Sequence, residues 1–199
     1  MSWHKLFFLI LIGAMVWQCR AAETISAGAA GITAPEAPKQ IALNNAETFE
    51  FNDYLLTPLA DFSVKAKVLS REDYFLDRES ELAPTDLALG WQQMSDEAVL
   101  SRINITQSGR WYRWQVKEFP IPRRAIETQS ANMHVIAADE DIAAMLDLVQ
   151  PGQLIHFEGQ LVRVEGYDGW HWQSSLSRDD TGAQACELVY VTALEILSP

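Results

Sequence analysis

Residues 130–164 read SANMHVIAADEDIAAMLDLVQPGQLIHFEGQLVRV, and this stretch decides the fold that the sequence predicts. Acidic residues at 139–141 suit the positive end of a helix dipole, so a short helix is expected to begin there. Apolar residues then recur at helical spacing and form one stripe that faces a core: Ile142, Met145, Leu146 and Val149. Pro151-Gly152 ends the helix and turns the chain.

The residues after this turn alternate as they do in a strand. Apolar residues and Gly159 face one side, with polar residues on the other side at His156, Glu158 and Gln160. The alternation slips at Leu161-Val162, and a glycine followed by such a slip predicts a β-bulge or a sharp bend. Bent strands let a short sheet close on itself. With alternating segments and turns elsewhere in the chain, the sequence predicts a mainly β fold, a small OB-like curled β-barrel with one or two short helices.

The same stretch resembles the later half of OB-fold-like domains of bacterial envelope proteins, in which a short helix leads through a Pro-Gly turn into a strand. The matching segments are 149–152 (VQPG) and 158–162 (EGQLV). Residues 84–191 also resemble an uncharacterised bacterial family of membrane-anchored envelope proteins. The segments that carry this resemblance are 86–91 (DLALGW), 130–134 (SANMH), 178–182 (RDDTG) and 185–187 (ACE). That family has no assigned activity, so the resemblance implies a location and no reaction.

The N-terminal residues 1–22 have the pattern of a signal peptide or of an uncleaved membrane anchor. A short positive end with Lys5 precedes an apolar run at 6–17, and small residues follow at 21–22. If the segment stays uncleaved, residues 6–19 would anchor the chain in the inner membrane. A lipoprotein site at Cys19 is disfavoured because the residue before it is not small. In each case we expect a periplasmic body, since positive charge stays inside.

Two further segments complete the predicted organisation. Residues 23–46 are rich in Ala, Gly, Pro, Ser and Thr, which is typical of a flexible tether. Residues 47–199 form the predicted OB-like β-barrel domain, and 48% hydrophobic residues in the whole chain are enough for its core.

Charge and cysteine content exclude several classes of function. The chain carries a formal charge of −12, and residues 1–22 contain two basic residues and no acid, so the remainder carries −14. Such an acidic body opposes nucleic-acid binding and attachment to anionic lipid. Of the two cysteines, Cys19 lies in the N-terminal segment, which leaves Cys186 alone in the body without a partner for a disulfide.

Cys186 belongs to one candidate catalytic set. A lone cysteine acts as a nucleophile when a base lowers its pKa. His134 is the candidate base, and Asp179 or Asp180 would orient its ring. The structural alternative is a polar turn at 178–182 with Cys186 packed as a small hydrophobe.

A second candidate site is a basic and aromatic segment at 110–124, which contains one acid, Glu118. Cationic groups in such a segment hold anions, and aromatic faces stack on sugars or bases. Asn132, next to a packed methionine, is a further candidate for a polar ligand. The predicted ligand-binding residues are Arg110, Trp111, Arg113, Trp114, Arg124 and Asn132. The structural alternatives are a solvated basic strand face and a buried asparagine that bonds loop backbone.

The three body histidines, at 134, 156 and 171, lack the close spacing typical of metal sites, so neither a metal nor a cofactor is predicted. The main hypothesis is a non-enzymatic, membrane-tethered envelope protein that binds a protein partner or an anionic ligand and makes an N-terminal membrane contact. The alternative hypothesis is a small hydrolase or transferase that uses Cys186 and His134. Nucleic-acid binding is not expected.

Overall fold

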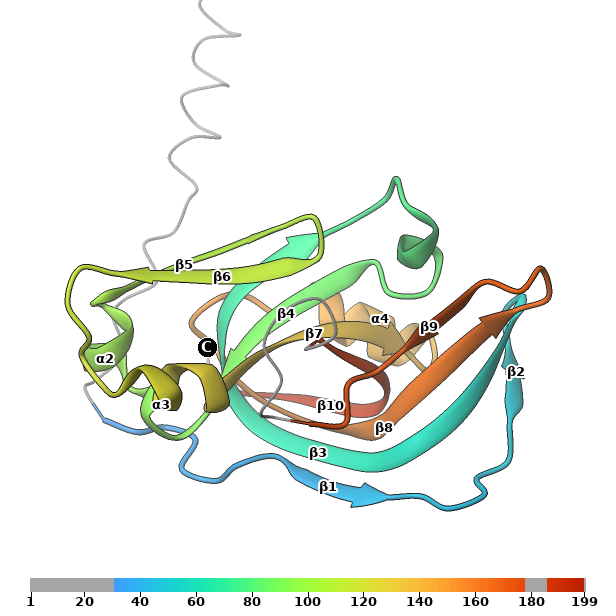
Figure 1. Ribbon diagram of the computed structural model, residues 1–199, viewed down its shortest axis with the longest axis horizontal. Coiled ribbons are helices and arrows are strands. Elements are labelled where there is room, and N and C mark those ends of the chain that lie inside the picture. Colours follow the sequence, from blue (N-terminus) through green and yellow to red (C-terminus); the bar gives the residue numbers. More distant parts are fainter. Residues whose placement is uncertain (1–30, 178–185, 199) are drawn as a thin grey trace, which may run out of the picture.

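The computed structural model describes residues 31–177 and 186–198, which are predominantly strands (Figure 1). The strands are β1 (Lys39–Ala42), β2 (Phe49–Phe51), β3 (Tyr54–Asp73), β4 (Thr85–Gly90), β5 (Ile103–Ser108), β6 (Trp111–Val116), β7 (Ser130–Ala137), β8 (Leu154–Gly166), β9 (His171–Gln173) and β10 (Glu187–Ser198). The helices are α2 (Glu97–Leu100), α3 (Arg123–Thr128) and α4 (Glu140–Asp147), with 3-10 turns η1 (Arg78–Glu81) and η2 (Gln92–Ser95). The predicted mainly β class is confirmed. None of the helices in the described residues has the length and apolar character that crossing a membrane requires.

Five strands form the framework. β3 pairs with β4, β4 with β7, β7 with β10, β10 with β8, and β8 again with β3, so the series of pairings returns to its first strand. The β7–β10 pair is parallel and the other four are antiparallel. β3 is a long strand that curves along one side of the molecule (Figure 1). One of its edges pairs with β8, and the other pairs in turn with β2, β1 and β4.

The irregularity predicted around residues 159–162 lies in the partner strands and not in β8 itself. The β3–β8 register shifts between Pro58 and Ala60, directly opposite Val162 and Leu161, and the β10–β8 register shifts between Val191 and Ala193. Gly159 is required by a close approach, because a Cβ atom there would lie 2.1 Å from the backbone oxygen of Tyr190. The adjacent apolar pair is buried on both faces of β8, Leu161 in the central core and Val162 in a second cluster. The slip in the pattern thus reflects a strand that is covered on both sides.

Helix α4 forms as predicted between β7 and β8. Asp139 caps it, since its side chain accepts a hydrogen bond from the backbone N–H of Ile142 at 2.8 Å. Leu146 and Val149, which lies just after the helix, are buried in the central core. The other two residues of the predicted stripe, Ile142 and Met145, pack against this core. The helix therefore packs against the core to which the five strands contribute apolar side chains.

The tether predicted at 23–46 is wrong for residues 31–42, which lie within the part of this segment that the structure describes, residues 31–46. β1 pairs with β3, and Ala34 is fully buried in the central core. The hydroxyl of Ser95 accepts hydrogen bonds from the backbone N–H groups of Thr33 and Ala34. The composition of this segment is typical of a linker, but backbone pairing with a long neighbouring strand needs no periodic side-chain pattern, and the ordered domain therefore begins before residue 47.

Residues 91–129 are an insertion between β4 and β7. It holds η2, α2, the β5–β6 hairpin and α3, which share a small core of their own around Met94, Ile103 and Ile126. The hairpin forms a separate two-stranded sheet and extends over β4 and β7 (Figure 1). Gly109 and Arg110 at its tip have φ values of 57° and 64°, the positive values that a two-residue hairpin turn of the favoured twist demands.

Candidate ligand-binding site

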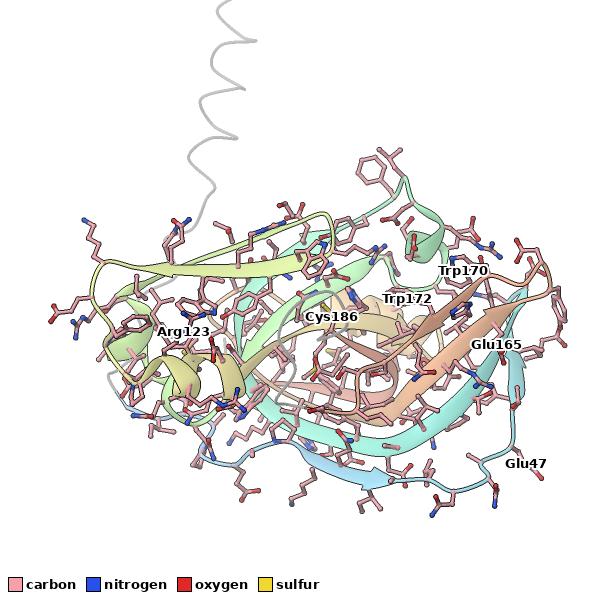
Figure 2. The ribbon with its side chains drawn as sticks, in the orientation of Figure 1. Glu47, Arg123, Glu165, Trp170, Trp172 and Cys186 are labelled. Carbon is pink, nitrogen blue, oxygen red and sulfur yellow. The ribbon has the colours of Figure 1, made fainter. Side chains whose placement is uncertain are left out.

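A cavity of about 790 Å³ lies where the β3–β4 connection, the hairpin tip, and the chain around β9 and the start of β10 meet. Its lining consists of Glu79, Arg110, Trp111, His134, Cys186 and residues 171–177. In Figure 2, Trp172 and Cys186 mark two of the segments that contribute to it. A somewhat larger hollow of about 900 Å³ lies beneath the tip of the β3–β4 connection, but it contains none of the predicted site residues. The smaller cavity is therefore the candidate site.

Arg110 joins the hairpin tip to the strands below it. Its Nε and Nη2 groups donate to the two carboxylate oxygens of Asp77 at 3.0 and 2.8 Å. Its Nη1 group donates to the backbone oxygen of Ala83 at 3.0 Å and to Oδ1 of Asp86 at 3.1 Å. The guanidinium also lies over the ring of Tyr74, 4.3 Å from its centre. These contacts offset the unfavourable positive φ of a non-glycine residue, and they hold the tip in place.

Asp86 is the centre of a buried polar cluster beside the cavity. It is fully buried on β4, opposite His134 in the β4–β7 register. The His134 Nδ1 atom lies 2.8 Å from Asp86 Oδ1, and Asn132 donates to the other carboxylate oxygen at 3.3 Å. Gln107 in turn donates to the side-chain oxygen of Asn132 at 2.6 Å. Burying a carboxylate costs free energy unless donors surround it, and here three side chains do so.

Aromatic side chains form one wall of the site. The ring centres of His134 and Trp172 are 4.9 Å apart, and the Arg110 guanidinium lies 5.5 Å from the centre of Trp172. Trp170 packs beside Trp172 at 6.3 Å. Trp111, on the hairpin, is 39% exposed and borders the cavity. The cavity thus offers one packed and one accessible indole.

The predicted catalytic set is only partly brought together. Cys186 and His134 border the same cavity, but no hydrogen bond joins them in the part of the chain that the structure describes. Burial raises the pKa of the Cys186 thiol to about 11. Asp179 and Asp180 lie outside the described residues, and the carboxylate that orients His134 is Asp86.

The predicted ligand-binding residues divide into two groups. Arg110 and Trp111 line the cavity, and Asn132 lies behind it in the Asp86 cluster. The other three lie away from it, in contacts within the insertion. Arg113 donates to the backbone oxygen and hydroxyl of Ser108, Trp114 packs against Phe119, and Arg124 lies 4.0 Å from Glu127. The segment 110–124 is therefore not one continuous binding face, because alternate residues of a strand point to opposite sides.

Sequence reasoning missed Asp86, Asp77 and Glu79. Asp86 had a usable signal, since it is the one charged residue in the strand TDLALG, all six residues of which are buried. A carboxylate in such a strand needs donors and marks a polar site. Asp77 and Glu79 belong to an irregular connection, and only the tertiary structure places them beside Arg110 and the cavity.

Among the described residues, no group of three or more His, Cys, Asp or Glu side chains is arranged to hold a metal ion. No protein-family model, curated protein or solved structure matches this chain. The function must therefore be argued from the site.

Proposed function

We propose that this chain is a non-enzymatic binding module of the bacterial envelope, built on an OB-like barrel, that holds a protein partner or a small polar ligand in the cavity beside Asp86 and His134. The barrel interpretation is supported by the returning series of strand pairings and by helix α4 between β7 and β8. OB barrels bind ligands on the face of their second and third strands, between the loop after the first strand and the loop before the last.

The position of the cavity carries the proposal. In the five-strand series, the second and third strands are β4 and β7, which supply Asp86 and His134. The loop after β3, the first of these strands, supplies Glu79. The segment before β10, the last of the five in chain order, supplies residues 171–177. The third strand and both loops of the expected OB binding surface therefore border this one cavity, and Asp86 of the second strand is hydrogen-bonded to His134 behind it.

The hydrogen bonds that Arg110 already makes within the chain weaken the hypothesis of an anionic ligand. Each nitrogen of its guanidinium donates a hydrogen bond within the chain, mostly to carboxylates. The other basic residues of segment 110–124 lie outside the cavity lining. An anion would thus meet no uncommitted cation from this segment, so we favour a protein partner or an uncharged or cationic ligand.

The alternative is a hydrolase or transferase that uses Cys186 and His134. Their place at one cavity and the Asp86–His134 hydrogen bond favour it, because a carboxylate that orients a histidine is a recurrent part of nucleophilic sites. The raised pKa of Cys186 opposes it, since the thiolate is the nucleophile.

Export and tethering by residues 1–22 belong to the same proposal. A reporter enzyme that is active only in the periplasm, fused after residue 199, should be active in the full-length chain and inactive when residues 1–22 are deleted. Activity in both, or in neither, would contradict export by this segment.

Photo-crosslinking tests the binding site in the full-length protein in bacterial cells. A photoreactive phenylalanine at Gln173, on the cavity rim, should yield one defined adduct, and the same group at the exposed Ile41 on β1 should not. Trp111→Ala should abolish the adduct, whereas the matched control Phe119→Ala, at an exposed aromatic outside the cavity, should retain it. Equal crosslinking from both positions, or none from Gln173, would refute the proposed site.

A further inference from the structure

We propose that the cavity recognises a primary ammonium group. This inference rests on the proposed function, because it names the ligand chemistry of that same site. Its supports are a hydrogen-bond acceptor at the cavity wall, an excess of negative charge and an accessible aromatic face.

The acceptor is Nε2 of His134. The Asp86 carboxylate already receives hydrogen bonds from Arg110 and Asn132, so it acts as an acceptor toward His134 as well. His134 therefore donates to Asp86 through Nδ1–H, and in the tautomer whose single ring proton lies there, Nε2 is a hydrogen-bond acceptor. The His134 side chain is only 5% exposed and borders the cavity, and within residues 31–177 and 186–198 its Nε2 has no hydrogen-bond partner. An acceptor that borders the cavity without a described protein partner can receive a hydrogen bond from a donor of the ligand.

The charge around the cavity selects a cationic donor. The described charged groups that line the cavity or bond Arg110 carry an excess of negative charge. They are the guanidinium of Arg110 and the three carboxylates of Asp77, Glu79 and Asp86. Hydrogen bonds from Arg110 lower the pKa of Asp77 to about 2, which keeps it ionised. The Glu79 carboxylate lines the cavity and forms no hydrogen bond or ion pair with any described residue. A cation is thus attracted, and a phosphate or carboxylate ligand is repelled.

The aromatic wall fits the same chemistry. The Arg110 guanidinium already lies over Trp172, 5.5 Å from its centre, which shows that this wall accepts a cation against an indole face. Trp111 is the more exposed indole at the rim and is the remaining surface for a second cation. An ammonium group at this place would donate to His134 Nε2 while its carbon stem lies along the ring.

A primary ammonium has two sources that suit an envelope protein: a lysine side chain of a partner protein, or an amino sugar. Both sources carry the same ammonium group, which is the group that the site recognises. The experiment therefore needs two matched pairs of probes, in which acetylation removes the charge and little else.

The test is isothermal titration of the purified full-length protein with four probes: glucosamine, N-acetylglucosamine, Nα-acetyl-lysine amide and Nα,Nε-diacetyl-lysine amide. We expect at least one amine-bearing probe to bind ten times more tightly than its acetylated counterpart. Glu79→Gln should weaken its binding about fivefold, the effect of one charge a few ångströms away in a solvated site. Glu81→Gln is the matched control, because Glu81 lies on the same turn but bonds Tyr54 outside the cavity, and it should leave the affinity within twofold.

His134→Phe tests the acceptor itself by keeping a ring without the nitrogen lone pair, and it should abolish the preference for the amine. If that variant fails to fold, the affinity of Glu79→Gln for the amine-bearing probe still tests the ammonium proposal. Equal or tighter binding of the acetylated probes would overturn the ammonium proposal while leaving a binding site in place. Binding of none of the four would also overturn it, and the crosslink at Gln173 would then decide the proposed function separately.

Discussion

Replacing Arg110 by methionine is the sharpest test of how the site is built. The substitution keeps an unbranched side chain of similar length and removes the donors to Asp77, Ala83 and Asp86. Asp86 is fully buried, so solvent cannot replace the lost guanidinium. The carboxylate would keep only the hydrogen bonds from Asn132 and His134.

Removing one partner of a buried ion pair costs about 3–5 kcal/mol, because the other charge stays behind uncompensated. We expect Arg110→Met to lower the free energy of unfolding by an amount in this range. Arg110→Gly should cost about 1 kcal/mol less than the methionine variant, since glycine adopts the φ of 64° at this position without strain. Arg113→Met is the matched control on the same hairpin. Among the described residues, its guanidinium bonds Ser108 at the surface, and surface changes of this kind alter stability by about 0.5 kcal/mol or less.

Urea unfolding followed by tryptophan fluorescence measures these differences. Arg110→Met combined with Asp86→Asn should be less destabilised than the sum of the two single variants, because the second change removes the stranded charge. If Arg110→Met and Arg113→Met lowered stability equally, or if the double variant were strictly additive, the buried pair would not hold the site together and the argument would fail.

Three further predictions test other parts of the structure. The Arg110 hydrogen bonds lower the pKa of Asp77 from 3.8 to about 2, so this contact stabilises the fold fully above pH 3.8 and is lost as the pH falls toward 2. The stability of Asp77→Asn should therefore depend less on pH over that interval than the stability of the unmodified protein, as measured by acid unfolding. Burial raises the pKa of Cys186 from 9.0 to about 11, so iodoacetamide should alkylate it about 100-fold more slowly in the native protein than in urea, and fast native alkylation would revive the Cys186 enzyme hypothesis. Gly159→Ala places a Cβ 2.1 Å from the Tyr190 backbone oxygen and should lower thermal stability by about 1–3 kcal/mol, whereas an unchanged melting temperature would mean that β8 and β10 separate easily.

The sequence predicted the central helix and strand well, because both depend on local patterns. The stripe ending at Val149 and the Pro151-Gly152 turn specify α4 without reference to the rest of the chain. The slip at Leu161-Val162 was also a true signal, but its cause is burial of both faces of β8, and the register shifts fall on β3 and β10. A strand's own residues do not reveal which of two paired strands accommodates the extra residue.

The candidate site was predicted in its residue types and not in its partners. His134 and Cys186 were singled out for their chemistry, and both do border one cavity with Arg110. The carboxylate that orients His134 is Asp86, 48 residues away in the chain. Sequence spacing cannot find such a pair, because only the β4–β7 register brings the two residues opposite one another.

By itself the sequence determined the mainly β class, helix α4 and an acidic body, since each follows from short-range periodicity or from composition. Only the tertiary structure decided that β1 belongs to the domain, that Arg110 is held by carboxylates of two other segments, and that the cavity lies between them. The physical reason is that backbone pairing and burial join residues far apart in the chain. An arginine can bind a ligand anion only if its guanidinium is not already paired with carboxylates of the same chain, and the sequence does not reveal that pairing.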